Sequence, residues 1–538
     1  MKKINLIIVA FIIPFILKAY TGQIIKSFNA PGKYITAICY DGNNIWAADR
    51  KEKKLFCLDK DNGKIIRSIP SPAFWTSGLT WDGKALWCSD VKGGLPLSEN
   101  YNGIVYKVSP NDGTILQTLR VPVRKIRGIA WDSKYLWCTD NASDKIMQFN
   151  ADDGTEIRSF SSPAGDAYGL AYDGKYLWNS DIALSEIYII NPEDGSVIVI
   201  AEAPGAFTNA LCFDGQYIWA NDLSSKKIYK LVAIDETKTR RYDEQKALLI
   251  YNHQVTNFGK GDLKSLDVYF AIPEERDNQL IHYSIGYSPN FTDIVTDKWG
   301  QKAAHFRINN LKPGNTNNIE IKIPVSTFNL RYYIYPDKVG KTEDIPLEIK
   351  KMFLADDEKY QKNNPVIQKG LKEAIGDEKN LYWSARKIYN YVMSHLYYEM
   401  SGGWNTAPTV LARGNGSCSE YSFVFISMCR AAGIPARYVG SIYREAPVFY
   451  DDAFHRWIEI YLPGYGWIPV DPTIGDKKSP REQALCFGFV SNEFFITTQG
   501  GGGSETLGWT YNSNEQYTSD PQTFITVDFW ADWQEFEK

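Results

Sequence analysis

One motif recurs five times in the first part of the chain, and it limits what this part can fold into. Each copy begins with an aromatic residue and an aspartate, has a tryptophan five residues after the aspartate, and has a second aspartate three residues further on. The tryptophans are Trp46, Trp87, Trp137, Trp178 and Trp219, and the aspartates that follow them are Asp49, Asp90, Asp140, Asp181 and Asp222. A period that is kept over five copies is the signature of a repeat architecture.

The period of this repeat matches a β-propeller blade. Successive tryptophans lie 41, 50, 41 and 41 residues apart, and an insertion around Gly93–Asn102 accounts for the longer spacing. Each unit contains short apolar strands separated by turns of the Asp-Gly type, which tolerate the positive φ of a tight hairpin. Four strands in about 40 residues are typical of one blade. We therefore predict an all-β propeller over residues 24–235 with five recognisable blades, and a degenerate sixth blade stays open.

The repeated aspartates also raise a calcium hypothesis, above all at Asp59–Gly63. We favour a β-turn there, because the segment lacks the spaced carboxylates and the terminal glutamate of a calcium loop. The recurring tryptophan is interpreted as packing between blades. Cysteines and histidines are not grouped at metal-ligand spacing, so the sequence predicts no metal site and no cofactor.

The N-terminus has the pattern of a secretory signal. Lysines at positions 2 and 3 precede an apolar run over residues 4–17, and small residues follow it. A membrane anchor is the alternative, but the run is shorter than the roughly 20 residues that a spanning helix needs. We predict a signal peptide over residues 1–22, export to the periplasm or the extracellular space, and no stable membrane span after cleavage. Export would permit disulfides among the eight scattered cysteines, whose pairing stays open.

The remaining length requires further domains, because 538 residues exceed what one hydrophobic core supports. Residues 236–343 alternate apolar and polar positions between turn signals, which predicts a β-sandwich-like domain. A charged, helical connector is expected over residues 344–379, and an α+β domain over residues 380–538. The net charge of -4 arises from interspersed signs, so we expect no nucleic-acid partner.

Cys418 occupies a position that suits a nucleophilic cysteine. It follows a glycine-rich loop, and Ser417 and Glu420 have the spacing of a capping box. This pattern makes Cys418 the first residue of a helix. A helix N-terminus and a neighbouring histidine both lower the pKa of a thiol, and the thiolate is the attacking form. Cys429 follows an apolar stretch of the same helix, and we interpret it as a core residue.

His455 and Asp471 are predicted to lie side by side. His455 begins an alternating strand, a turn at Gly464–Trp467 follows, and the returning strand ends at Asp471. Antiparallel strands joined in this way bring the residues near their open ends together. A histidine base and an orienting carboxylate are the partners that a catalytic thiol requires.

Three blocks of the sequence resemble the transglutaminase-like superfamily, whose members share a papain-like thiol fold. The blocks are Gly416–Tyr421 with the trailing Arg430–Arg437, then His455–Glu459, then Gly466–Thr473. The resemblance covers about residues 380–475. It implies Cys418 as the nucleophile, His455 as the general base and then acid, and Asp471 as the carboxylate that fixes the imidazole tautomer. By analogy, the oxyanion hole would use the Cys418 backbone N–H and a side-chain donor, for which Trp404 is the candidate.

Residues 236–343 resemble the β-domain that often precedes transglutaminase-like domains. The sequence as a whole predicts an exported cysteine-dependent enzyme that takes an acyl group from a protein or peptide substrate and passes it to water or to an amine. We favour amide or peptide hydrolysis over transglutamination, because water is the default acceptor. The propeller would recognise the substrate or a protein or cell-surface partner. The alternative is a binding or scaffold protein in which the propeller is the functional part and the transglutaminase-like domain is inactive.

Overall fold

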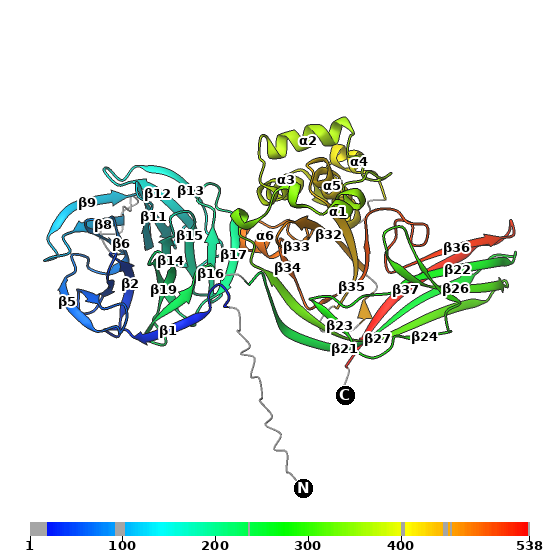
Figure 1. The fold of residues 1–538 in the computed structure, drawn as a ribbon, viewed down its shortest axis with the longest axis horizontal. Coiled ribbons are helices and arrows are strands. Elements are labelled where there is room, and N and C mark those ends of the chain that lie inside the picture. Colours follow the sequence, from blue (N-terminus) through cyan, green and yellow to red (C-terminus); the bar gives the residue numbers. More distant parts are fainter. Residues whose placement is uncertain are drawn as a thin grey trace, which may run out of the picture. The chain divides into compact units, whose positions relative to one another are not determined.

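The computed structural model describes residues 19–91, 103–234, 237–399, 404–444, 450–451 and 454–535. Two compact units make up the chain, and each is described by itself (Figure 1). The first unit comprises Met1–Pro192 with Ala201–Thr237, and the second comprises Glu193–Ile200 with Lys238–Lys538. Most of the predicted signal peptide over residues 1–22 lies outside the described residues.

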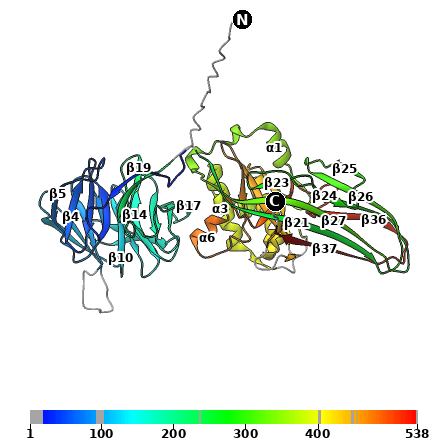
Figure 2. The ribbon, with the colours of Figure 1, turned by 90° about the horizontal axis from the view of Figure 1, so that it is seen from below.

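The first unit is a β-propeller of five four-stranded antiparallel sheets (Figures 1 and 2). Three of the blades contain β2 (Ile35–Tyr40), β3 (Ile45–Asp49), β4 (Lys54–Leu58) and β5 (Ile65–Pro70), then β6 (Thr76–Trp81), β7 (Leu86–Asp90), β8 (Gly103–Val108) and β9 (Ile115–Val121), then β10 (Ile126–Trp131), β11 (Tyr135–Asp140), β12 (Lys145–Asn150) and β13 (Glu156–Ser161). The other two contain β14 (Ala167–Tyr172), β15 (Leu177–Asp181), β16 (Glu186–Ile190) and β17 (Val197–Glu202), then β18 (Thr208–Phe213), β19 (Tyr217–Asp222), β20 (Lys227–Val232) and β1 (Ile24–Asn29).

The innermost strands β2, β6, β10, β14 and β18 form a closed ring, since each contacts the next and β18 contacts β2. β1 pairs with β20, so the first strand of the propeller is the outer strand of its last blade. Five blades complete the ring, and a degenerate sixth blade is absent from the described residues.

The repeated aspartates hold each blade together by hydrogen bonds. The first aspartate of each copy accepts the indole N–H of the motif tryptophan at 2.7–2.9 Å. The second accepts a backbone N–H from fifteen residues earlier, as Asp49 does from Tyr34. The motif tryptophans are only 0–1% exposed. Their burial agrees with the packing role that the repeat predicted.

The segment Asp59–Gly63 forms a turn. Asp59 Oδ1 accepts the backbone N–H of Asp61 at 2.7 Å and that of Asn62 at 3.2 Å. Gly63 donates its N–H to the Asp59 carbonyl and has a φ of 73°, which favours glycine. The Asp59 carboxylate therefore caps a turn, as the β-turn hypothesis proposes.

The second unit contains two antiparallel sheets of long strands, which run side by side in Figures 1 and 2. One sheet contains β21 (Thr239–Asn257), β23 (Gln279–Ile281), β24 (Gly286–Ser288), β27 (Thr316–Tyr332), β31 (Tyr450–Asp451), β34 (Phe489–Val490) and β37 (Ile525–Gln534). The other contains β22 (Leu263–Ala271), β25 (Asp293–Thr296), β26 (Lys302–Leu311) and β36 (Ser513–Ser519).

The last two strands of the chain belong to these sheets, whereas the sequence places them in the domain over 380–538. β37 pairs with β21, and β36 pairs with β22. Tyr251 and Ser513, which share a hydrogen bond of 2.6 Å, are 262 residues apart. The alternation of apolar and polar residues in a strand does not specify which strand it pairs with. The pairing of β36 and β37 with these sheets could therefore not be predicted from the sequence.

A third sheet carries the helices. Its order is β33 (Gly466–Val470), β32 (Phe454–Leu462), β30 (Ala436–Tyr443) and β35 (Phe494–Gly500). The other elements are the 3-10 turns Pro336–Lys338 and Thr342–Asp344, α1 (Leu347–Phe353), α2 (Pro365–Ile375), α3 (Leu381–His395), β28 (Tyr397–Tyr398), α4 (Ala407–Arg413), β29 (Asn415–Gly416), α5 (Cys418–Ala431) and α6 (Pro480–Leu485). Helix α5 packs against β30 and β32 and contacts α2, α3 and α4, so it is the central helix.

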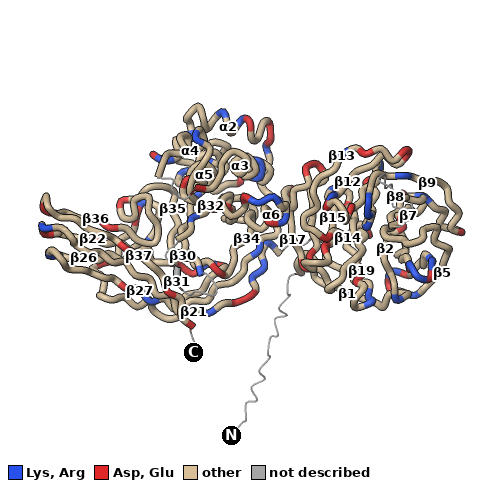
Figure 3. Tube along the Cα trace, turned by 180° about the vertical axis from the view of Figure 1, so that it is seen from behind, with Lys and Arg blue, Asp and Glu red and all other residues tan. Residues whose placement is uncertain are grey.

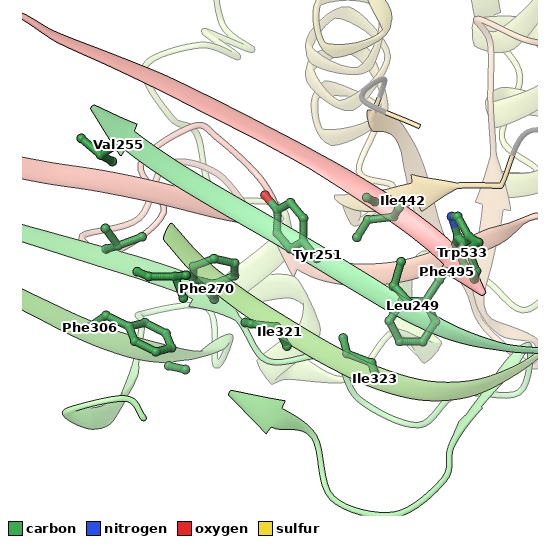
Figure 4. Packing of buried hydrophobic residues seen from close by; sticks show 14 of the residues in the cluster. Leu249, Tyr251, Val255, Phe270, Phe306, Ile321, Ile323, Ile442, Phe495 and Trp533 are labelled. Carbon is green, nitrogen blue, oxygen red and sulfur yellow. The ribbon is translucent and has the colours of Figure 1, made fainter. Parts of the chain in front are cut away.

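One hydrophobic core joins the long strands to the third sheet (Figure 4). Tyr251 and Phe270 enter it from β21 and β22, and Ile442 and Phe495 enter it from β30 and β35. All four are at most 4% exposed. A side chain of this kind contributes on the order of 1.5–3 kcal/mol when it is fully buried. The sheet that carries the thiol site is therefore braced by the two sheets of long strands.

Charged residues of both signs are spread along both units (Figure 3). Figure 3 shows lysine and arginine interspersed with aspartate and glutamate along the trace of each unit. A search of the described residues for a helix long and apolar enough to cross a bilayer finds none.

Candidate active site

Cys418 is the first residue of helix α5, and Ser417 is its N-cap. The predicted capping box forms, with the Glu420 carboxylate accepting the Ser417 backbone N–H at 3.2 Å. Gly416 permits this entry, because an added Cβ would lie 2.9 Å from Glu420 Cβ. The unpaired N–H groups of the first helical turn give this end a partial positive charge beside the thiol.

Glu420 is a fully buried carboxylate that fixes the start of the helix. It also accepts the backbone N–H of Asn405 at 3.0 Å, the Asn405 side-chain amide at 2.9 Å and Arg413 Nη2 at 2.7 Å. These bonds connect the end of α4 and the segment before it to the first turn of α5. The position of Cys418 thus depends on a hydrogen-bonded cluster around one carboxylate.

His455 and Asp471 meet on the hairpin formed by β32 and β33. Val470 pairs with Ile458, so Asp471 follows directly on the paired part of the strand. His455 Nε2 lies 2.6 Å from Asp471 Oδ2. The second carboxylate oxygen, Oδ1, accepts two backbone N–H groups at 2.9 and 3.1 Å. The carboxylate is therefore held in place from both sides, and the imidazole keeps Nδ1 for the thiol.

Cys418 and His455 form a hydrogen-bonded acid and base pair. Burial would raise the pKa of the Cys418 thiol, but the hydrogen bond and charge of His455, with the backbone N–H and charge of Arg456, lower it below its ordinary value. Burial would lower the pKa of His455, but the charge and hydrogen bond of Asp471, with the thiolate, raise it to about 10. These shifts favour a thiolate and an imidazolium over the neutral pair.

Cys418, His455 and Asp471 open onto one cavity of about 650 Å³. Its remaining lining is mainly apolar and includes Trp457 and Phe494, whose ring centroids lie 5.7 and 5.6 Å from that of His455. Apolar walls exclude water and strengthen the electrostatic interactions within them. The Cys418 thiol thus faces a cavity with mainly apolar walls.

The segment that contains all three residues has a family match. Residues 369–472 match the model of the transglutaminase-like superfamily. This segment is a transglutaminase-like domain. The match confirms the resemblance that the three sequence blocks predicted and supports a cysteine-enzyme fold for this part of the chain.

Relatives of the chain share limited identity with it. It is 22% identical over 263 residues to an uncharacterized protein of Haemophilus influenzae, which covers 42% of this chain and 69% of that protein. It is 25% identical over 181 residues to the kyphoscoliosis peptidase of Mus musculus, which covers 31% of this chain but only 27% of the peptidase. A solved structure of a candidate cysteine protease from Cytophaga hutchinsonii is 17% identical with a TM-score of 0.37, over 54% of this chain and 99% of that one.

Arg456 is a residue of the transglutaminase-like domain that sequence reasoning missed. Its side chain is 0% exposed, and its guanidinium lies 4.3 and 4.5 Å from the ring centroids of Tyr438 and Tyr511. Nη2 donates to the Trp509 carbonyl at 2.6 Å, whereas Nε and Nη1 have no partner among the described residues. The signal in the sequence was limited to a charged residue between His455 and Trp457 in a strand that also contains Glu459.

Tyr511 also reaches the thiol of the transglutaminase-like domain. Its phenol is hydrogen-bonded to Cys418 and lies 3.0 Å from the Phe454 carbonyl oxygen. Burial and the neighbouring thiolate raise the pKa of the Tyr511 phenol, so it keeps its proton. Gly440 makes room for the ring, since an added Cβ would lie 2.5 Å from Tyr511 Cβ. No local pattern connects this tyrosine to the three blocks.

Trp404 lies at the edge of the transglutaminase-like domain. Its side chain is 43% exposed, and its ring centroid lies 5.0 Å from the Arg456 guanidinium and 6.2 Å from the Phe423 ring. The ring is thus near the charged neighbour of His455. Its part in an oxyanion hole stays a prediction.

The other two cysteines of this domain differ from Cys418. Cys429 is 0% exposed, and burial raises the pKa of its thiol, which confirms it as a core residue. Cys486 lines the same cavity as Cys418, but burial and the charge of Asp471 raise the pKa of its thiol. Only Cys418 among the three has its pKa lowered. Within the described parts of the chain, no three His, Cys, Asp or Glu side chains are grouped to hold a metal ion.

Proposed function

We propose that this protein is a cysteine-dependent enzyme that hydrolyses an amide or peptide bond through Cys418, His455 and Asp471. The observation that supports this most directly is the hydrogen-bonded chain from the Cys418 thiolate through His455 to Asp471, whose second link measures 2.6 Å. The raised pKa of His455 and the lowered pKa of Cys418 are the shifts that such a nucleophile needs.

The proposed first step forms an acyl-enzyme. The Cys418 thiolate attacks the carbonyl carbon of the substrate, and the carbonyl electrons move onto its oxygen. The Cys418 backbone N–H at the helix start would stabilise this oxyanion, with Trp404 as the proposed second donor. The His455 imidazolium then gives its proton to the departing amine, so the C–N bond breaks and a thioester remains.

The proposed second step releases the acyl group to water. Neutral His455 takes a proton from the water as its oxygen attacks the thioester carbonyl. The C–S bond breaks, the carboxylic acid leaves, and the thiolate and imidazolium are restored. Asp471 fixes the imidazole tautomer and stabilises its charged form in both steps. Water is favoured over an amine as acceptor because it needs no binding pocket of its own, whereas transglutamination would need one for a cationic amine.

Two substitutions in the same cavity test this proposal. Cys418→Ala should abolish both labelling by iodoacetamide at neutral pH and cleavage of a protein mixture, with a loss of at least about a thousandfold in kcat/KM. Cys486→Ala is the matched control, since it removes a cavity thiol whose pKa is raised. A labelled amine in the same reaction reports transfer as incorporation and hydrolysis as new peptide termini. Full activity in Cys418→Ala would exclude Cys418 as the nucleophile, and the absence of labelling and cleavage in the wild type would favour the binding or scaffold alternative.

We also propose that the protein is exported and that its propeller recognises the substrate or a protein or cell-surface partner. The N-terminal charge and apolar run support export. Cell fractionation with N-terminal sequencing tests it, and the expected mature chain starts near residue 23. Retention of Met1 on cytoplasmic protein would contradict export.

A further inference from the structure

The β-propeller carries a cavity of its own, with a volume of about 240 Å³. Each innermost strand contributes one lining residue, and all five stand ten residues before a motif tryptophan. These residues are Thr36, Ser77, Arg127, Tyr168 and Asn209. We call this ring and the cavity that it surrounds the propeller mouth. It lies where the innermost strands begin.

The next position along the same strands is conserved in size between the five copies, whereas the residues of the propeller mouth differ. It holds only small residues, which are Ala37, Gly78, Gly128, Gly169 and Ala210. A Cβ added at Gly128 would lie 2.3 Å from the Tyr168 carbonyl oxygen, so the close approach of the strands demands small residues. The propeller mouth has a different residue in every copy. Thr36 and Asn209 each donate to a backbone carbonyl of a neighbouring innermost strand, so ring packing accounts for them. It does not require an arginine and a tyrosine at Arg127 and Tyr168, which line the cavity.

Two arginines reach the propeller mouth without an anionic partner. The guanidinium carbons of Arg50 and Arg127 lie 4.2 and 5.8 Å from the ring centroid of Trp75. The Nε atom of each is buried and has no hydrogen-bond partner among the described residues. No described carboxylate forms an ion pair with either guanidinium, and Asp166 instead accepts the side-chain amide of Asn141 at 2.6 Å.

A partly buried cation without an ion pair is costly, because it loses hydration without gaining a full counter-charge. Burial and the charge of Arg50 lower the pKa of Arg127, and the nearby charges of Tyr168 and Asp166 offset part of this shift. An anion in the cavity would relieve both effects. The planar guanidinium matches a carboxylate through two parallel hydrogen bonds.

The rest of the lining points to an organic anion. Trp75, Tyr168 and Phe207 supply aromatic walls, whereas the polar groups of Thr36 and Asn209 are already hydrogen-bonded within the ring. Inorganic phosphate would leave the aromatic walls without a partner. The volume is below the roughly 300–1,000 Å³ of sites for drug-sized ligands, which favours a ligand of about amino-acid size. We infer that the propeller mouth binds a small organic carboxylate that carries an apolar or aromatic group.

Calorimetric titration of the full chain tests this inference with three probes. N-acetyl-L-phenylalanine carries both the charge and the ring, its neutral amide lacks the charge, and inorganic phosphate lacks the ring. We expect saturable binding of the acid, at least about tenfold weaker binding of the amide, and weaker binding of phosphate. Binding of the amide or of phosphate as tight as that of the acid would overturn the inference, as would the absence of saturation by the acid at millimolar concentration.

Variants locate the binding. Arg127→Gln and Arg50→Gln should each weaken binding of N-acetyl-L-phenylalanine at least about tenfold. Arg67→Gln is the matched control, because Arg67 also lies over a tryptophan, 5.1 Å from the Trp46 ring, but outside the cavity. Equal affinity in wild type and Arg127→Gln, or an equal loss in Arg67→Gln, would refute the site. If Arg127→Gln lowers the melting temperature, the affinity of Arg50→Gln for the acid, compared with that of the wild type, tests the site instead. Because the binding is read from the propeller variants, its failure leaves the proposed thiol chemistry untouched.

Discussion

His455 Nε2 lies 2.6 Å from Asp471 Oδ2, and the two residues are sixteen positions apart on the two strands of one hairpin. The base and its carboxylate are therefore aligned by local structure. Cys418 comes from a different element, helix α5, which packs against β32. The distance between nucleophile and base thus depends on tertiary packing, whereas the orientation of the base does not.

Asp471→Asn should remove the charge that supports the imidazolium while keeping an oxygen for the backbone contacts. We expect the pKa of His455 to fall and kcat/KM to drop by about 10²–10⁴ at neutral pH. Steady-state kinetics with a peptide substrate measures this. Glu482→Gln is the control, because Glu482 is a carboxylate in the lining of the same cavity that does not contact His455. Equal losses in both variants would argue against a specific role for Asp471.

The pH dependence of the thiol should differ from that of a free cysteine. The lowered pKa of Cys418 means that the thiolate persists as pH falls below the range where free thiols protonate, about 8.5. The raised pKa of His455 means that the imidazolium persists until pH approaches about 10. Alkylation by iodoacetamide should therefore persist to lower pH than that of a free cysteine, and amide hydrolysis should decline as His455 deprotonates near pH 10. An alkylation rate that rises through pH 8.5 would contradict the ion pair.

Arg456→Met tests the buried guanidinium behind the thiol. Loss of the guanidinium charge should raise the pKa of Cys418, because this charge is one of the causes that lower that pKa. Alkylation of Cys418 at low pH should therefore be slower. Methionine fits an aromatic environment, so thermal stability should hold. Arg437→Met is the contrasting control, because Arg437 is ion-paired with Glu459 at 2.7 Å and its loss should lower the melting temperature without changing the thiol. The reverse pattern would assign Arg456 a structural role.

Glu420→Gln should destabilise the thiol-bearing helix. The substitution weakens the charge-assisted bonds from Arg413 and from two backbone N–H groups, which costs about 1–3 kcal/mol in the free energy of unfolding. Urea denaturation measures the loss. Glu348→Gln in α1 removes an exposed ion pair with Lys351 and should leave stability unchanged within error. Similar stability in the two variants would argue against a stabilising role of Glu420 at the start of the helix.

Gly128→Ala should disrupt the ring of innermost strands. The new methyl group would meet the Tyr168 carbonyl oxygen at 2.3 Å, and relief of that contact requires backbone shifts that cost at least about 1–3 kcal/mol. Gly165→Ala is the control in the same propeller, because an added Cβ there meets nothing within 4 Å. Calorimetry should show a lower melting temperature for the first variant alone.

The features that the sequence predicted well are local ones. The motif tryptophans and their aspartates are five residues apart and bond within one blade, so a fixed spacing was enough to reveal the propeller. The capping box at Cys418 and the hairpin with His455 likewise involve short separations. These elements could be read from turn residues and periodicity alone.

The features that escaped prediction depend on long-range packing. β36 and β37 pair with strands that lie more than two hundred residues earlier in the sequence. The alternation of apolar and polar residues in a strand does not specify which strand is its partner. Tyr511 reaches Cys418 only because the chain leads back into β36, and Arg456 is noticeable only once its aromatic surroundings are known. In each case the partner, not the residue type, defines the role.

The return of the C-terminal strands also sets an order of events during synthesis. Tyr511 stands just before β36, and Ala531 and Trp533 of β37 complete the core that braces the thiol sheet. A nascent chain that has already emerged through Cys418, His455 and Asp471 still lacks these parts. The surroundings of the Cys418 thiol are therefore complete only once the segment from residue 511 onward has packed against them.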